Sequence, residues 1–301
     1  MNAKDSKEKV AWVSGAIVPA AHALSVADRG FTLGDSVFET VLVKDGVPLF
    51  WSEHVSRLLV GLRALRMQVD FDFRDVKAIA KIIKILISRN NLSSDYYAMR
   101  VTVSRGCGGR GLQVLPDMIP TIAITLAAYQ PIAHGAVHSI VYDEVRRTST
   151  KLTTFKHSGS YGVNVLARIA ADERGADDAI LLNPEGNITG LTAANLFAIL
   201  PDGTTLTPRI EDGALPGVVR NILVSDLEEV VAAPFNLSLL HDALLFATNC
   251  LMGIRKIKIV SDIAGENSCS TAQLSIISRL EAHYERAVIC SFDATREGLL
   301  G

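Results

Sequence analysis

Short runs of alternating or continuously apolar residues mark the strands that this sequence predicts. Residues 11–19 read as two strands around a Ser-Gly turn, and residues 38–43 read as a strand that ends at an Asp-Gly hairpin signal. The β-branched and aromatic residues in such runs favour extended backbone. Further strands are predicted at 95–104, 120–129, 136–142, 178–182, 187–189, 195–200, 245–248 and 254–260.

Apolar residues at three- and four-residue spacing predict helices between these strands. The first helix follows Ser52, a residue type that commonly caps helices, and carries an apolar stripe from Val55 to Leu65. Strands with interspersed helices, and no repeat of about 20–50 residues, indicate a mixed α/β or α+β fold. The other helices are predicted at 73–88, 158–174, 218–231 and 270–287.

Chain length and one linker-like segment indicate two domains. The chain has 301 residues, which is large for a single compact core. The segment QPIAHG at 130–135 places a proline and a glycine between two apolar strands. We therefore expect a leader at 1–10, a small α/β domain at 11–129, a linker at 130–135 and a larger domain at 136–301.

Composition narrows the class of protein. A net charge of −2 gives no electrostatic footprint for nucleic acid. No apolar run approaches the roughly 18–20 residues that span a bilayer, and the mixed charges of the N-terminus do not fit a secretory signal. The four cysteines are scattered without a Cys-x-x-Cys pair, so we expect reduced thiols in a cytoplasmic protein and no metal site.

A lysine and a helix start carry candidate chemistry. Lys156 is followed by small polar residues at the start of a predicted helix, whose hydroxyl and N–H groups suit an anion. Tyr161, five positions on, is placed to reach the same ligand. The pair Pro216-Gly217 precedes another predicted helix and leaves its first N–H groups available. Taken alone, a solvated lysine and an ordinary helix start explain these residues more simply.

Arginines supply a second set of candidates. The segment SRGCGGRG at 104–111 holds Arg105 and Arg110, which could clamp a substrate carboxylate, although a surface loop explains it equally well. It is neither a Walker loop nor a Rossmann fingerprint, because no Gly-Lys-Ser/Thr and no helix follow it. Arg57 could bind a phosphate, but an arginine on an amphipathic helix more often lies on the solvated face.

The order of the short motifs is more informative than any one of them. Together they resemble the class IV, or fold-type IV, pyridoxal-phosphate enzymes, which include branched-chain aminotransferases, D-amino-acid aminotransferases and aminodeoxychorismate lyase. The resemblance covers residues 12–260 and implies a small N-terminal α/β sandwich, a larger C-terminal domain with a barrel-like sheet, pyridoxal 5'-phosphate as cofactor and a homodimer. The motifs are ADRGFTLGDSVFET (27–40), EHVSRL (53–58), SRGCGGRG (104–111), TFKHSGSY (154–161), ADDAILLNPEGNITG (176–190), AANLF (193–197), ALPGVVR (214–220) and TNCLMGI (248–254).

The resemblance implies roles for individual residues. The catalytic lysine that forms a Schiff base with the cofactor falls on Lys156. The cofactor-binding positions fall on Arg57, Tyr161, Gly190, Leu191, Val218, Val219, Thr248 and Asn249. The substrate-binding positions fall on Phe38, Thr40, Arg100, Arg105 and Arg110.

Gly190 departs from the family pattern. The family places a glutamate here, and that carboxylate keeps the pyridine nitrogen of the cofactor protonated so that the ring is a strong electron sink. Val219 likewise replaces a threonine of the phosphate site. A lyase tolerates a weaker sink because its product gains aromaticity, whereas an aminotransferase depends on the sink more. Restoring glutamate at position 190 is therefore expected to raise aminotransferase turnover.

The motif details favour the lyase. SRGCGGRG, the Lys-His pair, AANLF and NCLMGI look like aminodeoxychorismate lyase. We therefore expect a 4-amino-4-deoxychorismate lyase that forms 4-aminobenzoate and pyruvate, a reaction of folate biosynthesis. Two alternatives stay open. One is a class IV aminotransferase acting on branched-chain or D-amino acids, and the other is a degenerate homologue that has altered or lost the cofactor chemistry and acts as a binding protein.

Overall fold

The computed structural model describes residues 9–131, 135–260 and 269–300. Most of the expected leader, 1–8, and the middle of the expected linker, 132–134, lie outside the described residues. The chain divides into two compact units. Unit 1 comprises Met1–Pro131, Lys156–Gly159 and Ile289–Gly301, and unit 2 comprises Ile132–Phe155 and Ser160–Val288.

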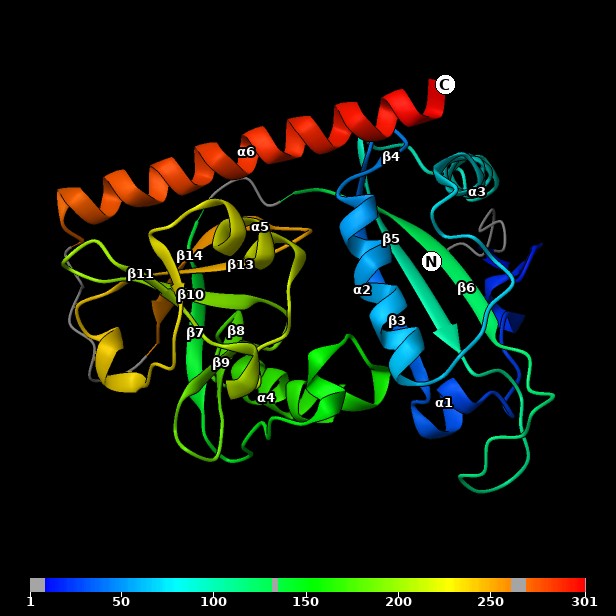
Figure 1. The fold of residues 1–301 in the computed structure, drawn as a ribbon, viewed down its shortest axis with the longest axis horizontal. Helices are drawn as coiled ribbons and strands as arrows, with labels where there is room; N and C mark the ends of the chain where they lie inside the picture. The colour runs from blue at the N-terminus through cyan, green and yellow to red at the C-terminus, as the bar shows by residue number, and fades with distance from the viewer. Residues whose placement is uncertain (1–8, 132–134, 261–268, 301) are drawn as a thin grey trace, which may run out of the picture. The chain divides into compact units, whose positions relative to one another are not determined.

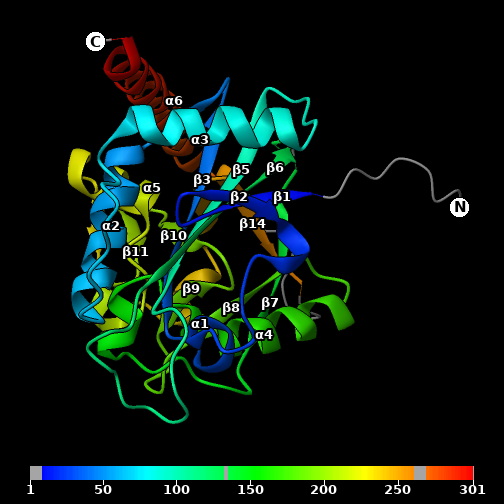
Figure 2. The ribbon, with the colours of Figure 1, turned by 90° about the vertical axis from the view of Figure 1, so that its right-hand side faces the viewer.

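Unit 1 is built on a six-stranded sheet in the order β2-β1-β6-β5-β3-β4, in which all pairs are antiparallel (Figure 1). Helix α2 (Trp51–Ala64) packs against β3, and α3 (Val76–Arg89) packs against β1 and β6 (Figure 2). A short helix, α1 (Arg29–Leu33), precedes β3, and η1 is Ala20–His22. The strands are β1 (Val10–Val13), β2 (Ala16–Pro19), β3 (Ser36–Lys44), β4 (Val47–Pro48), β5 (Tyr96–Ser104) and β6 (Thr121–Tyr129).

Side-chain alternation gives this sheet two different faces. Along β5, Tyr97, Met99, Val101 and Val103 are buried, while the residues between them point to the opposite face. The buried set packs with the apolar stripes of α2 and α3, which therefore cover that face. The opposite face carries polar side chains of β3 and β5, including Arg100.

Unit 2 contains an eight-stranded mixed sheet in the order β12-β11-β10-β13-β14-β7-β8-β9, curled into a half-barrel. The strands are β7 (Val137–Tyr142), β8 (Asp178–Leu182), β9 (Ile188–Leu191), β10 (Asn195–Ile199), β11 (Thr205–Thr207), β12 (Val230–Ala232), β13 (Leu244–Asn249) and β14 (Gly253–Ile259). The helices are α4 (Gly162–Glu173), α5 (Val218–Asp226) and α6 (Thr271–Leu300), and the 3-10 turns are η2 (Lys151–Thr154), η3 (Ser158–Tyr161), η4 (Ile210–Asp212) and η5 (Leu237–Leu240).

The core of unit 2 lies on both sides of this sheet. Helix α4 places three buried alanines, Ala167, Ala170 and Ala171, against β7 and β8, and their small size allows a close approach (Figure 1). On β10 and β13, Phe197 and Phe246 stack with ring centroids 4.7 Å apart. Every residue of β10 is buried, so this strand is held firmly at the centre of the unit.

The predicted fold class, mixed α/β with a barrel-like second sheet, is confirmed. Several boundaries differ from the prediction, and the main differences lie at helix ends. Phe50, with φ 51°, rather than Ser52 caps α2. The helix predicted at 218–231 ends at Asp226 and β12 follows, and the last helix continues to Leu300. Within the described ranges, no helix combines the length and hydropathy needed to cross a membrane.

Candidate functional site

The segment around Lys156 runs beside the first part of β3 in unit 1. The N–H of Phe38 donates to the Lys156 carbonyl oxygen at 3.1 Å, and Val37 and His157 form an antiparallel bridge. These backbone contacts fix the chain on both sides of Lys156. Its side chain is half-buried, so the amine is positioned by the sheet without being sealed from ligands.

Phe38 is a platform for two cations. Lys156 Nζ lies 4.9 Å and Arg100 Cζ lies 3.8 Å from the centroid of its ring, both within range of a cation–π interaction. Arg100 is opposite Thr40 in the β3–β5 register and donates from Nε to Thr102 Oγ1 at 3.2 Å. The predicted residues Phe38, Thr40, Arg100 and Lys156 are thus brought together, and an anionic substrate group there would meet two positive charges.

His157 follows Lys156 directly and is largely buried. Burial lowers the pKa of its imidazole below the ordinary value, and the negative charge of Asp35 only partly opposes this effect. At neutral pH, the ring is therefore uncharged and adds no third positive charge beside Lys156.

Glu39 is a buried acid that the sequence analysis did not select. Its carboxylate is 1% exposed and accepts from Arg57 Nε at 2.7 Å and Arg57 Nη2 at 2.6 Å, while His54 Nδ1 lies 2.7 Å away. Burial alone would raise the pKa of Glu39, but Arg57 and His54 outweigh it and lower the pKa to about 2. Two of the Arg57 donors are therefore occupied, and a phosphate contact by Arg57 stays a prediction.

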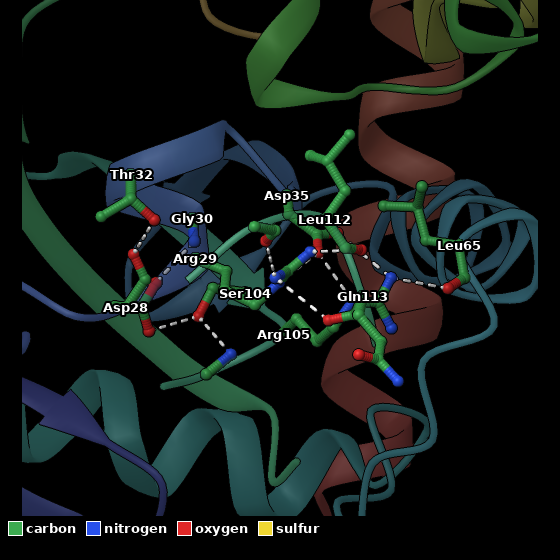
Figure 3. Close-up of polar contacts among 12 residues, drawn as sticks. Asp28, Arg29, Gly30, Thr32, Asp35, Leu65, Ser104, Arg105, Leu112 and Gln113 are labelled. Atoms are coloured by element: carbon green, nitrogen blue, oxygen red, sulfur yellow. Dashed lines mark hydrogen bonds and ion pairs between the residues drawn. The ribbon is translucent and has the colours of Figure 1, made fainter. Parts of the chain in front are cut away.

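Arg105 is held in a second buried ion-pair network (Figure 3). Its Nε and Nη2 donate to Asp35 at 2.7 and 3.1 Å, and Nη2 also donates to the Leu65 carbonyl at 2.8 Å. Arg29 Nε donates to the same Asp35 at 3.0 Å. Burial opposes ionisation of Asp35, yet the hydrogen bonds from Arg105 and Arg29 keep its pKa below the ordinary value. Substrate binding by Arg105 remains a prediction, with most of its donors already engaged.

Arg29 also holds the loop that contains the glycine-rich segment SRGCGGRG (104–111) (Figure 3). Its guanidinium donates to the carbonyls of Gly111 at 3.0 Å and of Leu112 and Gln113 at 3.4 Å each. Arg110 lies in this fastened loop with its side chain exposed. It is therefore accessible to a ligand, and its predicted role in substrate binding stays untested.

In unit 2, the start of α5 and the Thr248 hydroxyl, together named the anion cradle, offer donors that suit an anion. Gly217 is the N-cap of α5, and no described side chain caps this terminus, so the first N–H groups of Val218 and Val219 are available. Thr248 is 1% exposed, and its Oγ1 has no hydrogen-bond partner among the described residues. A buried hydroxyl without a partner is costly unless a ligand completes it. Helix N–H groups and a donor hydroxyl suit a phosphate.

Asn249, the other residue predicted near the phosphate, is engaged in a turn. Its Oδ1 accepts from the N–H groups of Leu251 at 2.9 Å and Met252 at 2.8 Å, and its Nδ2 donates to the Ala193 carbonyl at 3.2 Å. The side chain therefore shapes the end of β13. A direct contact between Asn249 and a phosphate would therefore need its backbone N–H group or a rearranged side chain.

Tyr161 ends η3 directly before α4 and has a cationic neighbour that the sequence analysis missed. Burial lowers the pKa of Arg147, and its interaction with Tyr161 opposes this effect. No described carboxylate forms an ion pair with Arg147, so its charge is available to a ligand beside Tyr161. The Arg146-Arg147 pair, four residues after the end of an apolar strand, was the signal that could have found it.

Gly190 has a backbone that only glycine adopts readily. Its φ is +139°, and a Cβ at this position would lie 3.0 Å from the Ala194 carbonyl oxygen. It pairs with Leu181 at an irregularity in the β8–β9 ladder, and Leu191 follows with its N–H donating to Ala194 O at 2.9 Å. The backbone at position 190 therefore favours glycine and disfavours glutamate, as it does any residue with a side chain.

We expect Gly190→Glu to lower the free energy of unfolding by about 2 kcal/mol, because a residue with a side chain is strained at this φ. The earlier expectation that this change raises aminotransferase turnover is accordingly replaced by one of no gain. Thermal or denaturant unfolding measures the effect, with Gly162→Glu as control. Gly162 is exposed, has no positive φ and has no atom within 4 Å of its Cβ position, so its substitution should change stability by less than about 0.5 kcal/mol. Stability unchanged in Gly190→Glu, together with faster amino transfer, would show that the backbone adapts.

Comparison with known proteins identifies the family of this chain. Residues 36–260 match the family profile described as "Amino-transferase class IV". The chain belongs to the class IV aminotransferase family. It is therefore a pyridoxal-phosphate-dependent enzyme, and the family prediction made from its motifs is confirmed.

Members of class IV with different activities resemble this chain. The aminodeoxychorismate lyase of Vibrio harveyi is 28% identical over 284 residues, which cover 90% of this chain and 98% of that protein. The D-alanine aminotransferase of Listeria monocytogenes is 24% identical over 230 residues, covering 73% and 76%. The solved branched-chain aminotransferase of Thermoproteus uzoniensis superposes with a TM-score of 0.80 at 21% identity over 95% of this chain and 97% of that one, which shows the shared fold.

Pyridoxal phosphate is the cofactor of class IV enzymes, and each unit can be compared with it separately. Within unit 2, the uncapped start of α5 and the buried Thr248 hydroxyl, which has no partner among the described residues, are donors of the kind that a phosphate needs. Within unit 1, the half-buried Lys156 carries an amine of the kind that binds an aldehyde. Position 190 supplies no acid for the pyridine nitrogen, and in this respect the chain differs from the family pattern.

Proposed function

We propose that this class IV enzyme is a 4-amino-4-deoxychorismate lyase that releases 4-aminobenzoate and pyruvate. The observation that carries the proposal is the match to the Vibrio harveyi lyase over 98% of that protein. The match to the Listeria D-alanine aminotransferase leaves about a quarter of each chain unaligned. The sequence alignment with the lyase thus includes segments that the sequence alignment with the D-alanine aminotransferase leaves out, and segments outside the common core often carry substrate selection.

The reaction removes one proton from the ring, breaks one C–O bond and adds one proton to the leaving group. The ring C–H bond breaks, the ether C–O bond breaks with its electron pair leaving on the enolpyruvyl oxygen, and the ring becomes aromatic. The released enolate takes up a proton at carbon to give pyruvate. Bound pyridoxal phosphate supplies an electron-withdrawing ring conjugated with the substrate nitrogen.

The residues of unit 1 supply what this reaction needs from the protein. Lys156 Nζ is the group that binds the cofactor aldehyde and then accepts the ring proton. Arg100 offers a fork of donors for a substrate carboxylate, 3.8 Å from the Phe38 ring. The glycine at position 190 fits the same account, because aromatisation drives the cleavage and reduces the demand on the pyridine ring.

A class IV aminotransferase is the second candidate, because named aminotransferases such as that of Listeria monocytogenes align with the central part of this chain. Incubation with 4-amino-4-deoxychorismate distinguishes the two. The lyase gives 4-aminobenzoate and pyruvate in equal amounts without any 2-oxo acid acceptor. Exchange of an amino group between an amino acid and a 2-oxo acid, with no 4-aminobenzoate formed, contradicts the proposal and supports the aminotransferase.

The proposal includes a homodimer in the cytoplasm. Large apolar side chains are exposed on α1 and on the loop that Arg29 fastens, among them Phe31 at 73%, Leu112 at 80% and Ile119 at 81%. Such a group of exposed apolar residues is typical of a surface that another chain covers. Sedimentation equilibrium at the mass of a single 32.4 kDa chain would contradict the dimer.

A further inference from the structure

Asn195, the first residue of β10, is buried and lies beside the anion cradle of unit 2. Its Nδ2 donates to the Leu215 carbonyl at 2.8 Å, and the Gly217 N–H donates to the same oxygen at 2.8 Å. One carbonyl thus joins the central strand to the turn that opens α5. The position of the α5 N-terminus is therefore set by the Asn195 carboxamide.

Gly217 is a glycine because Asn195 occupies the space beside it. Its φ of −68° and ψ of 143° are values that any residue adopts, so the backbone does not require glycine here. A Cβ on Gly217 would lie 2.0 Å from Asn195 Oδ1 and 3.1 Å from its Cγ. The Asn195 carboxamide therefore occupies the space that a methyl group on residue 217 would need.

Thr248 is the third residue of this group, beside Asn195 and Gly217. It is the direct cross-strand partner of Asn195 in the β10–β13 pair, so the two side chains lie next to each other on one face of the sheet. Its hydroxyl is buried and has no partner in the described part of the chain. The Asn195 side chain thus stands beside this donor and reaches the turn before α5.

We propose that Asn195 is the positioning residue of the cradle: it holds the α5 N-terminus so that the Val218 and Val219 N–H groups and the Thr248 hydroxyl converge on one phosphate. Asn195 acts through the Leu215–Gly217 turn and does not itself bind the anion. This proposal rests on the proposed function in one respect, which is that the phosphate belongs to pyridoxal phosphate. An amide is needed because an acid would set a negative charge beside the phosphate and face the Leu215 carbonyl with a second acceptor.

The test compares pyridoxal phosphate with pyridoxal, which has the same aldehyde and ring but no phosphate. In the full-length chain, Asn195→Ala and Asn195→Asp should each weaken pyridoxal phosphate binding roughly 10- to 100-fold, as outer-shell residues do in metal sites. The change for pyridoxal should stay below about 3-fold. Inorganic phosphate, titrated into the apoprotein and followed by ³¹P NMR, should lose affinity in parallel. This readout does not depend on the reaction, so it stands even if the lyase assay fails.

Gly217→Ala provides a second and independent arm. Alone, it should weaken pyridoxal phosphate binding as much as Asn195→Ala, because the new methyl group meets the carboxamide. In the double variant Asn195→Ala with Gly217→Ala, that conflict is gone, and affinity should equal that of Asn195→Ala alone. Additive losses, or equal losses for pyridoxal and its phosphate, would overturn the proposal.

Asn183→Asp is the matched control for folding. Asn183 is also a buried asparagine of unit 2 that donates to a carbonyl, that of Asp212 at 3.3 Å, but it lies in the β8–β9 turn. Its substitution should lower the melting temperature and leave the ratio of the two ligand affinities unchanged. A change in that ratio as large as that of Asn195→Asp would show a general loss of structure and contradict the assignment.

Discussion

Lys156→Ala is expected to lower kcat by about 10⁴-fold or more, because in the proposed mechanism Lys156 both binds the cofactor aldehyde and moves the substrate proton. Lys156 is fixed beside β3 by the Phe38 and Val37 backbone contacts, which alanine retains. The variant should therefore fold and still bind the phosphate end of the cofactor. Initial rates of pyruvate release and an absorption titration with pyridoxal phosphate measure the two effects.

Lys151→Ala is the matched control for this substitution. Lys151 lies in η2, five residues before Lys156, and its side chain is exposed. Its loss should leave kcat and the cofactor spectrum unchanged. A Lys156→Ala protein that keeps more than a few percent of wild-type turnover, or equal losses in both variants, would contradict the role given to Lys156.

Glu39→Gln is expected to lower the free energy of unfolding by about 3 kcal/mol, because it removes the charge that neutralises a buried arginine. Glu39 is 1% exposed, and its two oxygens lie within 2.7 Å of donors on Arg57 and His54. Glutamine has nearly the same shape, so a loss of this size reports charge pairing rather than packing. Urea unfolding at neutral pH measures it, and Glu53→Gln, at an exposed position on α2, the helix that carries His54 and Arg57, should change stability by less than about 0.5 kcal/mol.

The same pair makes a testable contribution to the pH dependence of stability. The folded pKa of Glu39 is about 2, against an ordinary value of 4.5. Because the folded pKa is depressed, the contribution is fully present above pH 4.5 and is lost as the pH falls from there toward 2. Wild-type stability should therefore decline across this window more steeply than that of Glu39→Gln. Parallel curves for the two proteins would contradict the ionised pair.

Local sequence patterns were enough to predict the strands, because the alternation of apolar and polar residues shows which side of a sheet is buried. The β3–β5–β6 core and the β8–β9 hairpin lie close to where the sequence predicts them. The α5 region shows the limit of such patterns. Leu227 and Val230 have helical spacing but equally fit an edge strand, and the parallel pairing of β12 with β11 decides the outcome. That pairing joins segments about 25 residues apart and leaves no local signal.

The candidate site shows a similar division. Lys156 and the start of α5 could be selected as candidates because their motifs are contiguous in sequence. Glu39 was missed because its partners come from a helix, and only packing of α2 on β3 brings them to the strand. The dihedral angle of Gly190 and the Asn195–Gly217 contact were likewise invisible, since a glycine in a sequence does not say whether φ or a neighbouring side chain requires it.

The central claim is that Lys156 carries the cofactor of this class IV enzyme. Reduction of the pyridoxal-phosphate-loaded wild-type protein with borohydride, followed by peptide mass mapping, tests it most directly. The account predicts a single phosphopyridoxyl adduct on the peptide that contains Lys156, with bleaching of the cofactor absorption. An adduct on another lysine, or no adduct on a protein that has taken up the cofactor, would contradict the account.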